Sequence, residues 1–185
     1  RDALEDSLAN LENGSKAFVF SSGLAAQSAV LEMLKPGDHI IAFDDLYGGT
    51  FRLLEEIKSK SSNLEISYVD YNKVDLNKII KNNTKLIWIE TPTNPLLKIT
   101  DLKKIASIAK KYKVLTICDN TFASPINQKP LDLGIDIVNH STTKYINGHS
   151  DIIGGALIIG KNKKLADKIA FIQNSVGAIP SPFDC

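Results

Sequence analysis

Seven short apolar runs alternate with stretches of helical pattern along the whole chain of 185 residues. The runs are rich in Val, Ile and Phe, and they lack the strict polar–apolar alternation of a strand with one solvated face. They cover Ala17–Phe20, His39–Phe43, Glu65–Val69, Lys85–Glu90, Val114–Asp119, Ile135–Asn139 and Ala156–Ile159. We therefore expect strands that are buried on both faces, in a mostly parallel seven-stranded sheet.

Helical patterns lie between these runs. In Leu102–Tyr112 the apolar residues recur at the spacing of one helix face, and Asp101 precedes them as an N-cap. A second helix is expected over Gly23–Lys35, because Pro36 and Gly37 then form a stop signal. Further helices are expected over Gly49–Lys60, Asn162–Val176 and, more briefly, Asp75–Asn82. Strands alternating with helices predict an α/β fold with helices on both faces of the sheet.

The composition excludes several classes of function. Hydrophobic residues make up 43%, charged residues 23%, and the net charge of +1 favours neither nucleic acid nor an anionic membrane. No apolar run approaches the about 20 residues that a membrane-spanning helix needs. Only Cys118 and Cys185 are present, which predicts a reducing, cytoplasmic compartment rather than a disulfide framework. His39, His140 and His149 lack metal-ligand spacing, so no metal site is expected.

Parallel sheets bind ligands at the carboxyl ends of their strands, so the residues after each run are candidates for a site. Ser21–Leu24 opens a helix after the first run, and the N–H groups of a helix N-terminus suit phosphate. Simple N-capping by Ser22 is the alternative. Tyr47 follows the second run and precedes two glycines. Its ring could stack on a flat cofactor, or it could be a half-buried core residue.

Later strand ends add an amide, a carboxylate and an amine. Asn94 lies between two prolines, where it could contact a ligand oxygen or serve as a turn residue. Asp119 ends an apolar run, and a buried carboxylate needs a cation such as a protonated pyridine nitrogen, or donors such as those of a helix or turn that it caps. Lys144 follows the hydroxyl residues Ser141 and Thr143, which could hold phosphate. Although most lysines are solvated, a desolvated lysine amine could form an imine.

Each of these signals is weak when it stands alone. Together they bring a phosphate anchor, a stacking ring, an amide, a pyridinium partner and an imine-forming lysine to one edge of the sheet. Pyridoxal 5′-phosphate (PLP) requires that set of groups, so PLP is the cofactor that we expect.

Five segments resemble the Cys/Met-metabolism PLP-dependent enzymes, a family that includes cystathionine γ-lyase, cystathionine γ-synthase and methionine γ-lyase. They are Phe20–Ala26, Asp45–Thr50, Trp88–Pro95, Asp119–Phe122 and Ser141–Asp151. The string Thr-Lys-Tyr-Ile-Asn-Gly-His-Ser-Asp over residues 143–151 is very specific, and the resemblance covers essentially the whole chain in order. Residues 173–182 resemble cystathionine γ-lyase and γ-synthase most.

The resemblance implies phosphate ligands. The backbone N–H groups of Gly23 and Leu24 would bind the phosphate, and Ser141 and Thr143 would add their hydroxyl groups.

It also implies contacts to the ring. Tyr47 would stack on the pyridine and help proton transfers, Asn94 would contact O3′, and Asp119 would pair with the ring N–H⁺. Lys144 would carry the cofactor as an imine and move protons. The catalytic residues would thus be Lys144, Tyr47 and Asp119, while Glu90 matches the family string without an assigned role.

The resemblance further implies an aspartate-aminotransferase-like type I fold, with residues 1–185 as an incomplete PLP-binding large domain. The implied reaction is γ-lyase cleavage of the small sulfur amino acid cystathionine to cysteine, 2-oxobutanoate and ammonia. The alternatives are cystathionine γ-synthase and methionine γ-lyase, and the expected assembly is a homotetramer of active dimers.

Relatives also have an N-terminal arm, which brings a Tyr and an Arg to the neighbouring subunit's phosphate, and a C-terminal domain with the arginine for the substrate carboxylate. Neither segment is matched, so we expect the chain to be part of a longer protein and to bind PLP poorly alone.

Two alternatives of other classes stay open. Gly155–Lys161 resembles the phosphate loop of a nucleotide-binding Rossmann module, although Asn162 replaces the required Ser or Thr and the intervening residues are strand-like. The other alternative is a catalytically silent fragment that serves only as a fold or assembly unit.

Overall fold

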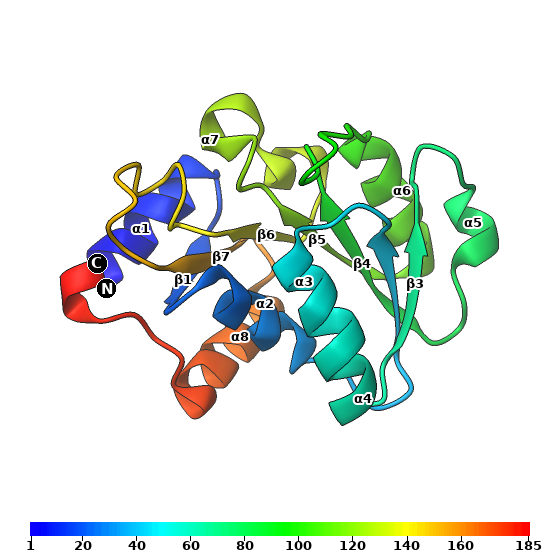
Figure 1. The fold of residues 1–185 in the computed structure, drawn as a ribbon, viewed down its shortest axis with the longest axis horizontal. Coiled ribbons are helices and arrows are strands. Elements are labelled where there is room, and N and C mark those ends of the chain that lie inside the picture. Colours follow the sequence, from blue (N-terminus) through cyan, green and yellow to red (C-terminus); the bar gives the residue numbers. More distant parts are fainter.

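A computed structural model describes all 185 residues as a single seven-stranded sheet with helices on both faces (Figure 1). The strands are β1 (Lys16–Phe20), β2 (His39–Phe43), β3 (Glu65–Val69), β4 (Thr84–Glu90), β5 (Leu115–Asp119), β6 (Ile137–His140) and β7 (Gly155–Ile159). Each corresponds to one predicted run. The largest difference is at β6, which begins at Ile137 rather than Ile135.

The strands are ordered β1-β7-β6-β5-β4-β2-β3. All neighbours from β6 to β3 pair in parallel, whereas β7 is antiparallel to both β6 and β1. The predicted mostly parallel seven-stranded sheet is therefore confirmed. Since β1 runs in the same direction as β6, the carboxyl ends of β1, β2, β4, β5 and β6 all lie at one edge of the sheet.

The helices are α1 (Asp2–Leu11), α2 (Gly23–Leu31), α3 (Gly48–Arg52), α4 (Ser59–Ser61), α5 (Leu76–Ile79), α6 (Leu102–Tyr112), α7 (Ser124–Asn127) and α8 (Lys163–Val176). The prediction for α6 is confirmed at both ends. The helix expected over Gly49–Lys60 is divided, because a π-helical segment at Leu53–Lys58 separates α3 from α4. Helix α2 ends earlier than expected, since the chain leaves helical geometry before Pro36.

Both faces of the sheet are covered. Figure 1 shows α1 and α6 on one side and α2, α3 and α8 on the other. Residues along β1 alternate between two apolar clusters: Phe18 and Phe20 join the large core that includes α2 and α8, while Ala17 and Val19 pack with Leu8 of α1. This double burial explains why the strand residues are apolar in succession, and it makes the sheet a rigid support for the loops at its carboxyl edge.

The segment that resembles a phosphate loop is strand β7, so the nucleotide-loop alternative is wrong there. Gly155 is required for close approach of two backbones, because a Cβ at this position would lie 2.2 Å from the carbonyl oxygen of Ser22. None of the helices has the length and apolar character needed to cross a bilayer.

Candidate active site

A cavity of about 380 Å³ opens at the carboxyl edge of the sheet. This volume is within the range of about 300–1,000 Å³ that is typical of small-ligand sites. All the residues predicted to bind the cofactor line it: Gly23, Leu24, Tyr47, Asn94, Asp119, Ser141, Thr143 and Lys144. Seven further residues line the cavity, and the sequence had assigned none of their side chains to a ligand: Ser22, Gln27, Glu90, Pro92, Thr121, Phe122 and Ile153. Of these, Ser22 was expected as a helix cap.

Asp119 ends β5 and presents a buried carboxylate to the cavity. Its Oδ1 accepts hydrogen bonds from the Thr121 backbone N–H (3.0 Å) and hydroxyl (2.6 Å). Its Oδ2 accepts from Asn139 Nδ2 (2.8 Å) and Gln27 Nε2 (3.3 Å). Four donors thus fix the orientation of this carboxylate and offset the cost of burying it.

The start of α2 provides donors on one side of the cavity. Ser22 caps the helix, since its Oγ accepts from the Ala25 N–H at 3.0 Å. The first-turn N–H groups of Gly23 and Leu24 have no carbonyl partner within the helix, so capping and anion binding are compatible. A Cβ at Gly23 would lie 3.1 Å from Ser141 Cβ, and glycine therefore allows α2 to begin against the loop after β6.

Three residues of the loop after β6 line the cavity. Ser141 and Thr143 line the cavity, although the Thr143 hydroxyl already donates to the Gly154 carbonyl and accepts from its N–H. Lys144 also lines the cavity, but it is exposed in this chain. Desolvation of its amine stays a prediction for the cofactor-loaded full-length protein.

The opposite side of the cavity is formed by Tyr47 and Asn94. Tyr47 is 44% exposed, so it is not a core residue. A Cβ at Gly49 would lie 2.4 Å from its Cε1, and the ring position thus depends on that glycine. The backbone N–H groups of Tyr47 and Asn94 both donate to Glu90. Burial, followed by the negative charge of Asp119, raises the pKa of the Glu90 carboxyl to about 8.

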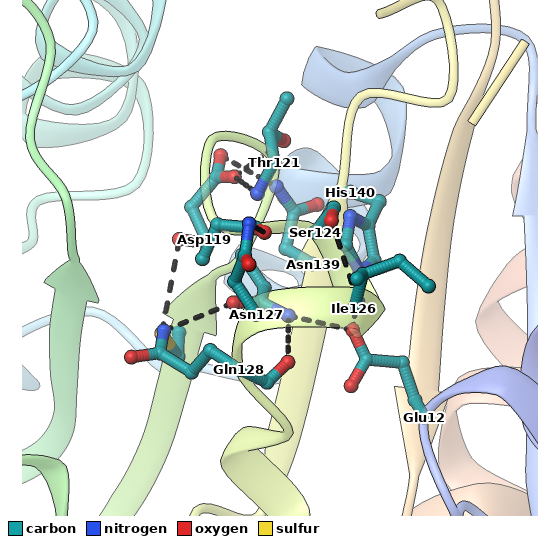
Figure 2. Close-up of polar contacts among 12 residues, drawn as sticks. Glu12, Asp119, Thr121, Ser124, Ile126, Asn127, Gln128, Asn139 and His140 are labelled. Atoms are coloured by element: carbon teal, nitrogen blue, oxygen red, sulfur yellow. Dashed lines mark hydrogen bonds and ion pairs between the residues drawn. The ribbon is translucent and has the colours of Figure 1, made fainter. Parts of the chain in front are cut away.

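A second layer of polar side chains lies next to Asp119, and Figure 2 shows its contacts around Glu12, Gln128 and His140. Glu12 Oε1 accepts from Asn120 Nδ2 at 2.7 Å and pairs with His140 Nε2, and all three side chains are buried. Gln128 Nε2 donates to Asn120 Oδ1 at 2.9 Å. Because Asn120 follows Asp119 and His140 precedes Ser141, this layer fixes the backbone on both sides of the site.

Sequence reasoning missed this layer, as well as Gln27, Thr121 and Asn139. The positions of Asn120 and His140 beside strand ends were a usable signal, whereas the partnership with Glu12 becomes visible only when α1 packs on the sheet. No group of three or more His, Cys, Asp or Glu side chains is arranged to hold a metal ion.

The residues that line the cavity fit PLP. An oriented carboxylate, a lysine amine, an aromatic ring and a set of helix N–H and hydroxyl donors surround a space of suitable size. The glycine at position 23 leaves backbone donors accessible where a side chain would crowd Ser141.

The family model of the Cys/Met metabolism PLP-dependent enzymes matches residues 1–185. The chain belongs to this family. PLP is the cofactor of the Cys/Met metabolism enzymes, and the type I α/β fold agrees with the sheet described above.

Relatives named for different activities are about equally similar to this family member. Cystathionine β-lyase of Coxiella burnetii is 51% identical over all of this chain and 48% of its own length. Cystathionine γ-synthase of Mycobacterium leprae is 51% identical over all of this chain and 47% of its own length. The crystal structure of cystathionine γ-lyase from Lactobacillus plantarum, complexed with L-serine, superposes with a TM-score of 0.94 and 47% identity, over 98% of this chain and 48% of that one. The chain thus spans about half the length of the curated relatives it matches.

Proposed function

We propose that this chain is the cofactor-binding part of a PLP-dependent transsulfuration enzyme of the cystathionine γ-lyase type. The proposed reaction cleaves the Cγ–S bond of cystathionine, consumes one molecule of water and releases cysteine, 2-oxobutanoate and ammonia. The observation that carries the proposal is the convergence of Lys144, Asp119 and Tyr47 on one cavity of a chain that belongs to a PLP-dependent family.

The proposed anchor for the cofactor phosphate consists of the N–H groups of Gly23 and Leu24 with the hydroxyl groups of Ser141 and Thr143. The position of these residues at the N-terminus of α2 and in the loop after β6 supports the assignment, since helix N–H groups and the helix dipole favour an anion. Because the Thr143 hydroxyl donates its only proton to the Gly154 carbonyl, it would have to reorient to donate to the phosphate.

When bound, PLP supplies an electron sink that stabilises negative charge at the α-carbon of an amino acid. The chain's own groups would then orient the reactants and move protons. Asp119, held by four donors, would keep a proton on a ring nitrogen, and Tyr47 would stack on the ring face, with Asn94 at the oxygen O3′. The Lys144 amine would hold the cofactor covalently, and once displaced by the substrate amine it would take the α-proton as a general base and then donate a proton to another atom as a general acid.

The choice of reaction depends on the resemblance of residues 173–182 to cystathionine γ-lyase and γ-synthase. Cystathionine γ-synthase and methionine γ-lyase are the alternatives, and the names of the relatives add cystathionine β-lyase. Product analysis of the full-length protein distinguishes these reactions. Cystathionine would yield cysteine and 2-oxobutanoate with a γ-lyase but homocysteine and pyruvate with a β-lyase, whereas a synthase would join cysteine to an activated homoserine.

Borohydride reduction tests the site directly. Reduction of the PLP-loaded full-length protein should fix the pyridoxyl group on the peptide that contains Lys144, and mass spectrometry of a digest should locate it there. Lys144→Ala should remove both the labelled peptide and the imine absorbance near the visible edge. A label on another lysine, or an unchanged absorbance in the variant, would contradict the assignment.

We also propose a homotetramer of active dimers in the full-length protein and a cytoplasmic location. Family resemblance supports the assembly, and the two unbonded cysteines, buried Cys118 and exposed Cys185, agree with a reducing compartment. Light scattering of the purified protein would test the assembly, since a monomer would contradict it.

A further inference from the structure

Glu90 is a buried carboxylate in the wall of the cavity, and none of the cofactor contacts proposed above gives it a role. It ends β4 and is 5% exposed. The sheet register places it directly beside Asp119 at the end of β5. Two carboxylates therefore lie next to each other at the floor of the proposed site.

The Glu90 side chain accepts backbone hydrogen bonds from two different loops. The Tyr47 N–H donates to Oε2 at 3.0 Å and to Oε1 at 3.2 Å, and the Asn94 N–H donates to Oε1 at 2.8 Å. Tyr47 belongs to the loop after β2, whereas Asn94 belongs to the loop after β4. One side chain thus joins the two backbones that carry the proposed ring-stacking residue and the proposed O3′ contact.

The position is electrostatically unfavourable for a carboxylate. Burial raises the pKa of Glu90, the charge of Asp119 raises it further, and Asp45 adds a smaller effect in the same direction. The two backbone donors act in the opposite direction. The only cationic side chain that lines the same cavity is that of Lys144. An apolar residue or an amide would fill this space at a lower desolvation cost, so packing alone does not explain Glu90.

A second carboxylate joins the same two loops farther from the cavity. Asp45, in the loop after β2, accepts from the Thr93 hydroxyl and from the Leu96 N–H (3.1 Å) in the loop after β4. Asp45 does not line the cavity. It therefore holds the outer parts of the loops, while Glu90 holds the backbone of the residues that face the cavity.

We propose that Glu90 is a positioning residue whose carboxyl group clamps the N–H groups of Tyr47 and Asn94 and so sets the separation between the Tyr47 ring and the Asn94 amide. The inference rests on the proposed PLP site, because these two residues are its proposed ring contacts. The clamp requires a side chain that is long enough to accept hydrogen bonds from both N–H groups. Glutamine keeps the length and the Oε1 acceptor, whereas aspartate keeps the carboxyl group but is one methylene too short.

Amide hydrogen exchange in the cofactor-free full-length protein tests the clamp independently of PLP. Glu90→Ala and Glu90→Asp should speed exchange of the Tyr47 and Asn94 N–H groups by about 10-fold or more, while Glu90→Gln should stay within about 3-fold of the parent. Glu5→Ala is the matched control. Glu5 is also buried and accepts a backbone N–H, that of Val19, but it lies outside the cavity. This control should speed exchange near Val19 and leave the two loops unchanged.

Cofactor binding gives the second measurement. In a PLP titration followed by absorbance and circular dichroism, Glu90→Ala and Glu90→Asp should weaken the apparent affinity about 10-fold and reduce the dichroism of the bound cofactor. Glu90→Gln and Glu5→Ala should remain near the parent. If Glu90→Ala does not fold, the comparison of the Asp and Gln variants decides the matter, since a role of charge alone predicts the reverse order.

The outcomes separate the two proposals. Parental exchange rates and affinity in Glu90→Ala or Glu90→Asp would overturn the clamp and leave the proposed function intact. Failure of the parent protein to take up PLP would overturn the proposed function, while the exchange rates would still decide whether Glu90 holds the two loops.

Discussion

The two edges of the sheet both bury polar side chains, but the buried carboxylates at the carboxyl edge face the cavity described above, whereas the His39 cluster at the amino edge does not. At the amino edge, His39 at the start of β2 bonds through Nδ1 to the Thr84 hydroxyl (2.7 Å) and through Nε2 to the Ser67 hydroxyl (2.9 Å). Both ring nitrogens thus have hydrogen-bond partners, and His39, Thr84 and Ser67 all lie outside the carboxyl-edge cavity. At the carboxyl edge, Asp119 and Glu90 are also well bonded, yet both contribute to the cavity wall. A closed polar cluster serves the fold, whereas an open one is available to a ligand.

The largest expected effect would come from Asp119→Asn in the full-length protein. The amide keeps the size of the side chain but loses the charge proposed to hold a proton on the ring nitrogen. We expect kcat/KM for cystathionine to fall by about 10³-fold, as for the removal of a preorganised electrostatic contact. Steady-state kinetics would measure this fall, and urea unfolding would verify a folded variant. His39→Gln, at the closed edge, should change kcat/KM by less than about 2-fold, and equal losses in both variants would break the comparison.

Two glycines, the first residue of β7 and the residue that follows its end, allow the free energy of unfolding to be compared between the two edges. Gly155 lies at the carboxyl edge, where an added Cβ would meet the Ser22 carbonyl oxygen at 2.2 Å. Gly160 lies at the other edge, where the nearest atom would be 4.0 Å away. We expect Gly155→Ala to lower the free energy of unfolding by about 2–4 kcal/mol, because backbone must move, and Gly160→Ala to change it by less than about 0.5 kcal/mol. Urea unfolding of both variants would test this, and similar values would show that the edge accommodates a side chain.

Much of this architecture could be predicted from the sequence because its signals are local. Continuous apolar runs marked each strand, and the rule that ligands bind at carboxyl ends of strands selected Asp119 and Lys144 before any contact was known. What could not be predicted depends on packing. Gln27 reaches Asp119 only because α2 packs over β7, β1 and β6, and Glu12 reaches His140 only because α1 packs on the other face.

The pH dependence of stability should differ in sign between the two edges, and the carboxyl edge should show the larger change. The pKa of Glu90 is raised in the folded protein from 4.5 to about 8, by burial and by Asp119. The folded state therefore binds this proton more tightly than the unfolded state does. The stabilisation is fully present below pH 4.5 and is lost as pH rises through 8.

In the cofactor-free protein, we expect the free energy of unfolding of the parent to fall by about 1–3 kcal/mol across this pH window relative to Glu90→Gln, whose side chain cannot titrate. Urea unfolding at a series of pH values would measure the difference, and parallel profiles for the two proteins would contradict it.

The smallest effect on stability is expected from the titration of His39, and its pH dependence is opposite in direction to that of Glu90. Burial lowers the pKa of this imidazole from 6.5, and the charge of Lys81 lowers it further, while Glu65 acts against both. The neutral ring is therefore favoured in the folded state. Its contribution to stability is present above pH 6.5 and is lost as pH falls through the lowered pKa. His39→Gln should flatten the acid side of the stability profile by about 1 kcal/mol or less and leave the alkaline side unchanged. A histidine NMR titration of the parent would check the cause independently. A folded-state pKa at or above 6.5 would mean that the closed cluster at the amino edge accepts a charged ring, and the contrast between the two edges would then lie only in their access to the cavity.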